Sequence, residues 1–284
     1  MLSQMGCFNP SNVPKCVTFP APNISLEILI LCLNYKGRGH VVALMDQSEV
    51  AKLDQNDWRR VALGDLADRL TPPSDFPCTF SQNAFRRELL QFSFVNQVAE
   101  VGFAAAMDDL RDYVEACQAW DGKVNSAIPL LMIFSHDAAG CQTLGQYHDL
   151  GWQALQYWHE NDPSSWPEDV SVEPESSFWS FCFAGTQLFV NMSAPLHKRR
   201  KSRNIGRYFT LVINPRERFD IVAGFTPEGQ RVRSKIRARA EVYDGMPHSP
   251  LLGSFQKGEL EWVQYALAEN NEPALTTCPF QQRH

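Results

Sequence analysis

Two histidines on one expected helix are the first candidates for chemistry in the chain. His148 and His159 lie eleven residues apart, close to three helical turns, so they share a helix face. A rise of about 1.5 Å per residue separates them by roughly 16 Å, too far to hold one metal ion together. Either could ligate a haem iron alone, with Trp152, Leu155 and Trp158 as apolar walls. A hydrogen-bonded histidine on a half-buried helix explains the same spacing.

Basic side chains are concentrated in one stretch of the chain. Residues 196–240 contain thirteen Lys or Arg residues against three acids, although the net charge of the whole chain is −6. The run from Lys198 to Arg203 could bind nucleic acid, act as a nuclear signal, hold carboxylates or phosphates, or lie in a solvated loop. The negative net charge opposes nucleic-acid binding over the rest of the surface, so we expect small anions instead.

Cys182 lies in an expected strand that is rich in aromatic residues. An interior cysteine at such a position is usually inert packing, and a thiolate ligand to haem iron is the alternative. The eight cysteines form no CxxC pair, so neither a zinc ribbon nor a compact disulfide framework fits. The sequence also lacks a Walker loop, a dinucleotide glycine fingerprint, a nucleophile elbow and an HExxH motif, which excludes the simplest enzyme classes.

The hydrophobic pattern predicts helices around a small sheet. Helical spacing recurs at residues 48–70 (broken at 56–57), 97–119, 144–160 and 231–242. Short apolar runs typical of strands occur at residues 128–134, 178–183, 187–192 and 207–213, with a hairpin turn at 184–186. Pro215 is expected in the first turn of a short helix through Val222. The sequence therefore predicts an α+β fold, a small and mostly antiparallel sheet flanked by helices.

The beginning of the chain differs in composition from the remainder. Residues 1–44 contain several proline breakers, so we expect a variable, dispensable N-terminal extension followed by a single domain over residues 45–284. The apolar run from Ile28 to Leu33 is far shorter than the roughly 20 residues that span a bilayer. Glu27 interrupts the one candidate signal peptide. We therefore expect a cytoplasmic protein without membrane association.

A series of short motifs follows between residues 76 and 280. It includes Phe76-Pro77-Cys78, Trp158-His159-x-x-Asp162, Ser180-Phe181-Cys182-Phe183, Lys201-Ser202-Arg203, Asn214-Pro215-Arg216, Ile236-Arg237-x-Arg239 and Glu261-Trp262-x-Gln264-Tyr265. Each motif is weak alone, but their types and order resemble those of the YqcI/YcgG family over roughly the last two hundred residues.

This resemblance implies a haem-dependent monooxygenase that hydroxylates a guanidine or amine nitrogen of an arginine-like substrate, as in antibiotic biosynthesis. Haem b is the implied cofactor, dioxygen or peroxide the oxidant, and a redox partner can be required. His159 occupies the matched position for the axial ligand beside Trp158, and Asp162 is expected to orient its second ring nitrogen and to assist catalysis. Cys182 and Cys78 are the alternative iron ligands.

Arg203, Arg216 and Arg237 are the basic positions that the resemblance matches. A guanidinium fork could hold a haem propionate or the carboxylate of an amino-acid substrate, and Arg203 is also a candidate catalytic residue. Two other functions are compatible with the sequence. One is a haem-binding sensor or carrier without turnover, and the other is a cofactor-free interaction protein that uses the basic residues 198–207.

Overall fold

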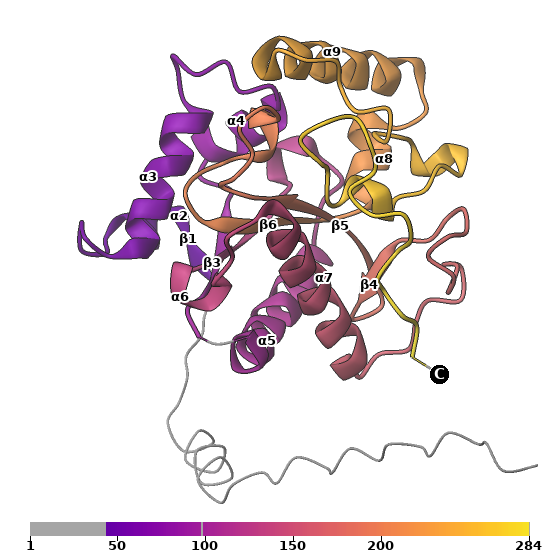
Figure 1. Ribbon diagram of the computed structural model, residues 1–284, viewed down its shortest axis with the longest axis horizontal. Coiled ribbons are helices and arrows are strands. Elements are labelled where there is room, and N and C mark those ends of the chain that lie inside the picture. Colours follow the sequence, from indigo (N-terminus) through magenta and orange to yellow (C-terminus); the bar gives the residue numbers. More distant parts are fainter. Residues whose placement is uncertain (1–43, 98, 284) are drawn as a thin grey trace, which may run out of the picture. The chain divides into compact units, whose positions relative to one another are not determined.

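The computed structural model describes residues 44–97 and 99–283 (Figure 1). Residues 1–43, which make up nearly all of the predicted extension, lie outside the described residues. The division at Met45 into an extension and a single domain therefore stays a prediction. Within the described ranges, no helix combines the length and the apolar character that crossing a bilayer requires.

A six-stranded sheet forms the centre of the described residues (Figure 1). Its order is β1-β2-β3-β6-β5-β4, and only β2 and β3 are parallel neighbours. The strands are β1 (Met45–Asp46), β2 (Gln91–Val95), β3 (Leu130–Phe134), β4 (Phe181–Phe183), β5 (Thr186–Ser193) and β6 (Phe209–Pro215). This mostly antiparallel sheet with flanking helices confirms the predicted α+β fold.

Eight α-helices occur in the part of the chain that the structure describes. They are α2 (Gln47–Ala51), α3 (Trp58–Leu70), α4 (Thr79–Arg86), α5 (Ala99–Cys117), α6 (His136–Ala139), α7 (Leu144–Asn161), α8 (Glu217–Ala223) and α9 (Pro227–Asp244). Helix α5 lies in the crossover between the parallel strands β2 and β3, which need such a connection. Figure 1 shows α5 and α7 in front of the sheet and α9 at the top.

The pleat of the central strands divides the hydrophobic core in two. In β3, Leu130 and Met132 pack with α5 and α7, whereas Leu131 and Ile133 pack with α2, α3 and α4. Alternate side chains of a strand point to opposite faces of the sheet, so β3 is buried on both. Its uninterrupted apolar sequence is typical of such a strand.

Each predicted helix occurs in the structure, but the starts of two helices and of one strand need correction. Helix α9 begins earlier than expected because Thr226 caps it and Pro227 lies in its first turn. The prediction for Pro215 is wrong, since this residue ends β6 and α8 begins at Glu217. Phe178 has a φ of 65°, in the left-handed region that interrupts a strand, and β4 begins only at Phe181.

Helix α5 carries a buried acid against the sheet. Asp109 is 1% exposed and accepts a hydrogen bond from Ser93 Oγ in β2 at 2.5 Å. Its Oδ1 has no hydrogen-bond partner within the described part of the chain. Burial is the main reason that the pKa of Asp109 rises from 3.8 to about 7. The folded state keeps this proton after the unfolded chain has released it, so the stability of the fold falls as pH rises across that interval.

We expect Asp109→Asn to remove this pH dependence. Between about pH 4 and pH 7, the parent should lose up to about 1.4 kcal/mol of unfolding free energy per pH unit relative to the variant. Urea unfolding of both proteins across this interval measures the difference. Glu115→Gln, which changes an exposed acid of the same helix, is the matched control and should follow the parent. A constant difference between Asp109→Asn and the parent would contradict the expectation.

Candidate active site

A cavity of about 420 Å³ lies on the face of the sheet that α3 and α4 cover. Helices α4, α8 and α9 and residues 252–255 form its walls. Its floor consists of alternate residues of β5 and β6, namely Phe189, Asn191, Ser193, Val212 and Asn214. Sites for small molecules and cofactors commonly have this size, so this cavity is the candidate active site.

Glu261 is a buried acid in the cavity wall. It directly precedes the short 3-10 helix η4 (Trp262–Gln264) and is 3% exposed. Its Oε1 accepts hydrogen bonds from Ser180 Oγ at 2.6 Å and from Tyr265 Oη at 2.7 Å. Burial raises the pKa of Glu261 to about 7, because the two hydroxyls and the nearby charge of Arg216 offset only part of the desolvation.

Arg203 fixes the backbone next to Glu261. Its Nη2 donates to the carbonyl oxygen of Gln264 at 2.9 Å, and its Nη1 donates to that of Tyr265 at 3.1 Å. Burial lowers the pKa of Arg203 to about 9. Arg203 lines the cavity, but both of its Nη groups are bound to carbonyl oxygens. Its main role there is therefore to hold the backbone of Gln264 and Tyr265 in place.

Arg216 and Asp220 form an ion pair at the junction of β6 and α8. The Nε of Arg216 donates to Gln187 Oε1 at 2.9 Å, and its guanidinium carbon lies 3.6 Å from the ring centroid of Phe255. The positive charge of Arg216 thus neutralises the negative charge of Asp220 within the protein. Glu261 therefore differs from Asp220, because its partners are neutral hydroxyls.

Arg233 and Arg237 lie one turn apart on α9 and line the cavity. Arg233 Nη2 donates to the carbonyl of Gly224 at 3.2 Å, and Arg237 Nη2 donates to that of Leu252. Burial lowers the pKa of Arg237, and the positive charge of Arg233 lowers it further. Arg237 Nη2 also donates to the carbonyl of Gly253 at 3.4 Å. The Nε and Nη1 groups of both arginines donate no hydrogen bond within the described residues, so a carboxylate in the cavity could accept from them.

Cys78 is the one cysteine or histidine among the described residues that line the cavity. It caps the N-terminus of α4, where its Sγ accepts the N–H of Ser81 at 3.5 Å. No group of three or more His, Cys, Asp and Glu side chains within residues 44–97 and 99–283 could hold a metal ion. Among the described residues that line the cavity, Cys78 is therefore the side chain that could ligate a haem iron.

The structure places His159 and Trp158 outside the cavity lining, in the core against the segment that ends at Arg283. His159 Nε2 accepts the backbone N–H of Arg283 at 3.1 Å, and its ring centroid lies 4.8 Å from that of Phe280. Trp158 is fully buried and donates to the carbonyl of Phe103 at 2.9 Å. The role of His159 as an iron ligand stays a prediction, and it requires displacement of residues 280–283.

Asp162 and Cys182 also lie outside the cavity lining. Both carboxylate oxygens of Asp162 accept backbone N–H groups, from Ser164 at 2.9 Å and from Ala184 at 2.7 Å. These bonds fix the turn after α7 against the hairpin. Cys182 is 2% exposed in β4, and burial raises the pKa of its thiol far above the usual range. The structure thus brings Arg203, Arg216 and Arg237 together at one cavity, which Cys78 also lines, and leaves the other predicted residues apart from it.

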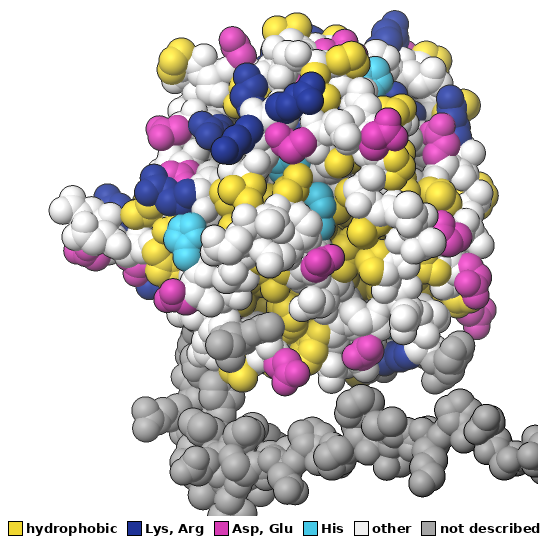
Figure 2. Space-filling model, in the orientation of Figure 1, with side chains coloured by type: hydrophobic (Ala, Val, Ile, Leu, Met, Phe, Trp, Pro, Cys, Tyr) yellow, Lys and Arg dark blue, Asp and Glu magenta, His cyan; other side chains and the backbone are white. Residues whose placement is uncertain are grey.

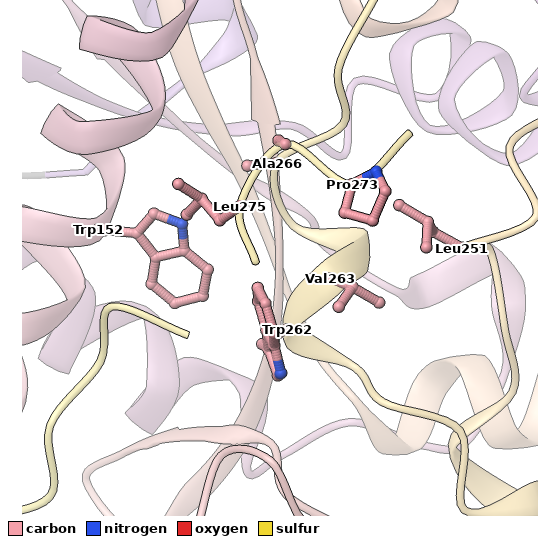
Figure 3. A pocket seen from close by; sticks show the side chains of 8 residues that line it. Trp152, Leu251, Trp262, Val263, Ala266, Pro273 and Leu275 are labelled. Atoms are coloured by element: carbon pink, nitrogen blue, oxygen red, sulfur yellow. The ribbon is translucent and has the colours of Figure 1, made fainter. Parts of the chain in front are cut away.

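A second hollow lies beside the helix face that the sequence suggested as a haem wall (Figure 3). Trp152 of α7 and Trp262 of η4 face it, surrounded by Leu251, Val263, Ala266, Pro273 and Leu275. Its volume is about 10 Å³, which admits about one water molecule. The aromatic face of α7 around Trp152 therefore contributes to the core, with no room there for a porphyrin.

The fold uses part of the basic run for internal contacts. Arg200 and Arg203 are both buried, and Arg200 donates to the carbonyl oxygens of Ala268 and Asn270. Figure 2 shows that exposed Lys and Arg side chains gather in the upper part of one face, with acidic side chains among them. Only part of the run is thus available to a phosphate backbone, which disfavours nucleic acid as the partner.

Comparison with known proteins decides the family. The model of the YqcI/YcgG family matches residues 66–281, and every residue that lines the cavity falls within this span. The chain belongs to the YqcI/YcgG family. The resemblance inferred from the motif series is thereby confirmed.

Three relatives show how much of the chain the family accounts for. A Streptomyces lavendulae protein, DcsA, whose name gives it as a candidate N(omega)-hydroxy-L-arginine synthase, is 49% identical over 86% of this chain and 94% of its own. The uncharacterized Bacillus subtilis (strain 168) proteins YcgG and YqcI are 32% and 31% identical over 79% and 81% of this chain. They are covered over 88% and 87% of their own lengths. No solved structure is significantly similar to the chain.

Two polar residues that line the cavity, Glu261 and Asn191, are not among the site residues predicted from the sequence. Glu261 and Tyr265 are four residues apart, a spacing that lets the hydroxyl reach the carboxyl across one turn. That pair was the available signal. Asn191 lines the cavity between the apolar positions Val190 and Met192 of β5, and its Oδ1 has no hydrogen-bond partner in the described residues. A polar residue between two apolar residues of a buried strand is the sequence feature that could have indicated Asn191.

Proposed function

We propose that this protein hydroxylates a guanidine nitrogen of arginine or a closely related amino acid in the cavity beneath α9. The proposal draws on the 49% identity to DcsA, a protein named for N(omega)-hydroxy-L-arginine synthesis. The observation that carries it is the composition of the cavity. One wall contains the carboxyl of Glu261, and another contains the guanidinium groups of Arg233 and Arg237. Such a cavity has groups of opposite charge for the two ends of an arginine-like substrate.

The residues of the cavity fit a haem as the cofactor. Cys78 would supply the iron ligand. The remaining lining is largely apolar, which suits a porphyrin. When bound, haem supplies the activation of dioxygen or peroxide that N–H oxidation demands, and a redox partner is needed if dioxygen is the oxidant.

The protein's own part in the reaction is binding, orientation and exclusion of water. The apolar residues of α4 and α8 at the cavity, such as Phe80 and Phe219, limit the access of water to the bound groups. Arg203 holds the backbone of Gln264 and Tyr265, so the wall that contains Glu261 is preorganised. Holding the substrate in one orientation directs oxidation to one nitrogen.

The proposal is tested with purified protein, hemin and L-arginine. We expect uptake of about one haem per chain, seen as a Soret band, and formation of N-hydroxyarginine when peroxide or a reductant with dioxygen is added. Mass spectrometry of the product and omission of the oxidant complete the assay. A protein that takes up no hemin contradicts the haem-dependent oxygenase. Haem uptake without product from arginine or its guanidine analogues would favour a sensor or carrier instead.

A further inference from the structure

Glu261 is a charged group of the cavity without a cationic hydrogen-bond partner. Its Oε1 is held by two neutral hydroxyls, those of Ser180 and Tyr265. Its Oε2 accepts no hydrogen bond from any residue that the structure describes, although Glu261 lines the cavity. A carboxylate that is 3% exposed and lacks a paired cation is costly to keep ionised. A cationic ligand in the cavity would remove this cost.

Asp220, the other acid among the described lining residues, is not available to a cationic ligand in the same way. Asp220 is already paired with Arg216, which is itself bound to Gln187 and stacked on Phe255. The hydroxyls of Ser180 and Tyr265 instead fix the direction of the Glu261 carboxylate without neutralising it. Ser180 precedes β4 and Tyr265 follows η4, so two separate parts of the chain hold this one group. Its position is therefore preorganised for a ligand.

We infer that Glu261 is the residue that binds the substrate's guanidinium group, accepting its N–H donors on Oε2. This inference rests on the proposed function and names the group that selects its substrate. Arg233 and Arg237 on α9 are positively charged and line the same cavity, so they could bind the α-carboxylate of the same substrate. The cavity then distinguishes arginine from citrulline, which has a neutral urea in place of the guanidinium. Loss of a charge-assisted hydrogen bond in a buried site costs about 1.5–3 kcal/mol, or roughly 10-fold to 100-fold in affinity.

The ionisation of Glu261 gives the inference a pH signature. The groups that face it are the hydroxyls of Ser180 and Tyr265, the Arg216–Asp220 pair of β6 and α8, and the buried thiol of Cys182 in β4. The pKa of Glu261 is about 7 in the free protein, and the protonated acid cannot pair with a guanidinium. Arginine affinity should therefore fall as pH decreases below about 7, by up to about tenfold per unit. Citrulline affinity should stay nearly constant.

The experiment is isothermal titration of the haem-loaded protein with L-arginine and with L-citrulline, without oxidant. Glu261→Gln keeps the shape of the side chain and an oxygen for the two hydroxyls. It should lose about 10-fold to 100-fold in arginine affinity and most of the preference for arginine over citrulline. Glu272→Gln removes an exposed acid outside the cavity lining and should retain both. An unchanged arginine-to-citrulline ratio in Glu261→Gln would overturn the inference.

The parent protein keeps the test decisive if Glu261→Gln fails to fold. A rise in arginine affinity through about pH 7, with citrulline flat, supports the inference, and a flat arginine profile overturns it. Because the binding assay needs no turnover, failure of this inference can be distinguished from failure of the proposed function. A parent that hydroxylates arginine with no dependence of binding on Glu261 contradicts this inference alone. A parent that binds arginine through Glu261 but forms no product contradicts the proposed function alone.

Discussion

Replacing Cys78 with serine should abolish or alter the spectrum of the bound haem, whereas replacing His159 with glutamine should leave it intact. Cys78 lines the cavity and its sulfur bonds only to a backbone N–H. His159 is 2% exposed, and its Nε2 is occupied by the N–H of Arg283. Glutamine can accept that same bond, so the variant separates the loss of an imidazole from the loss of packing.

Hemin titration followed by Soret spectroscopy measures haem retention, and the ferrous–CO spectrum reports the ligand type. The parent and His159→Gln should both give a thiolate-type spectrum. Cys141→Ser, which changes a half-exposed cysteine outside the cavity lining, is the matched control for Cys78→Ser. An imidazole-type spectrum that disappears in His159→Gln would instead establish His159 as the ligand. It would also require the segment at residues 280–283 to move when haem binds.

Replacing Arg203 with methionine should cost about 2–4 kcal/mol of unfolding free energy. The guanidinium is buried and satisfies the carbonyls of Gln264 and Tyr265, and methionine leaves both without a donor. Arg203→Lys should lose less stability than methionine, because one ammonium supplies some but not all of the paired donors. Since these carbonyls adjoin Glu261, both variants should also weaken arginine binding.

Urea unfolding and isothermal titration of the same variants check this expectation. Arg199→Met is the matched control, because it removes an exposed arginine from the same basic run. Its effect should stay within about 0.5 kcal/mol, as for most surface substitutions. Equal losses in Arg199→Met and Arg203→Met would show that the buried contacts to Gln264 and Tyr265 contribute nothing specific.

The sequence predicts the long elements well because their signals are local. The spacing of α7, the apolar run of β3 and the turn between β4 and β5 each depend on neighbouring residues. The sequence pattern predicts neither helix α4 nor the parallel strand β2. Their signals are short, and the pairing of β2 with β3 depends on a crossover of more than thirty residues.

The sequence predicts only part of the candidate site, because the site also depends on residues that are far apart in the chain. Arg203, Arg216 and Arg237 came from the family resemblance, and the fold brings them to one cavity whose lining extends from Leu66 to Gln264. No local pattern contains such a juxtaposition. The aromatic neighbours of His159 were ambiguous, because a porphyrin wall and a hydrophobic core use the same residue types. In this chain the residues around Trp158 pack the core.

The two faces of β5 bear different constraints on change over evolutionary time. Val190 and Met192 are held by close packing against the opposite layer, where most substitutions lower stability. Asn191 and Ser193 face the cavity, where a substitution is expected to alter what can be bound, whereas Phe189 lines the cavity and also packs against the core. Substitutions on the cavity-facing side of β5 should therefore change ligand binding with less effect on stability than substitutions on its core-facing side. We expect exchange of Asn191 and Ser193 to change the ligand preference of the cavity with little loss of stability, and a combinatorial library at these two positions would test this expectation.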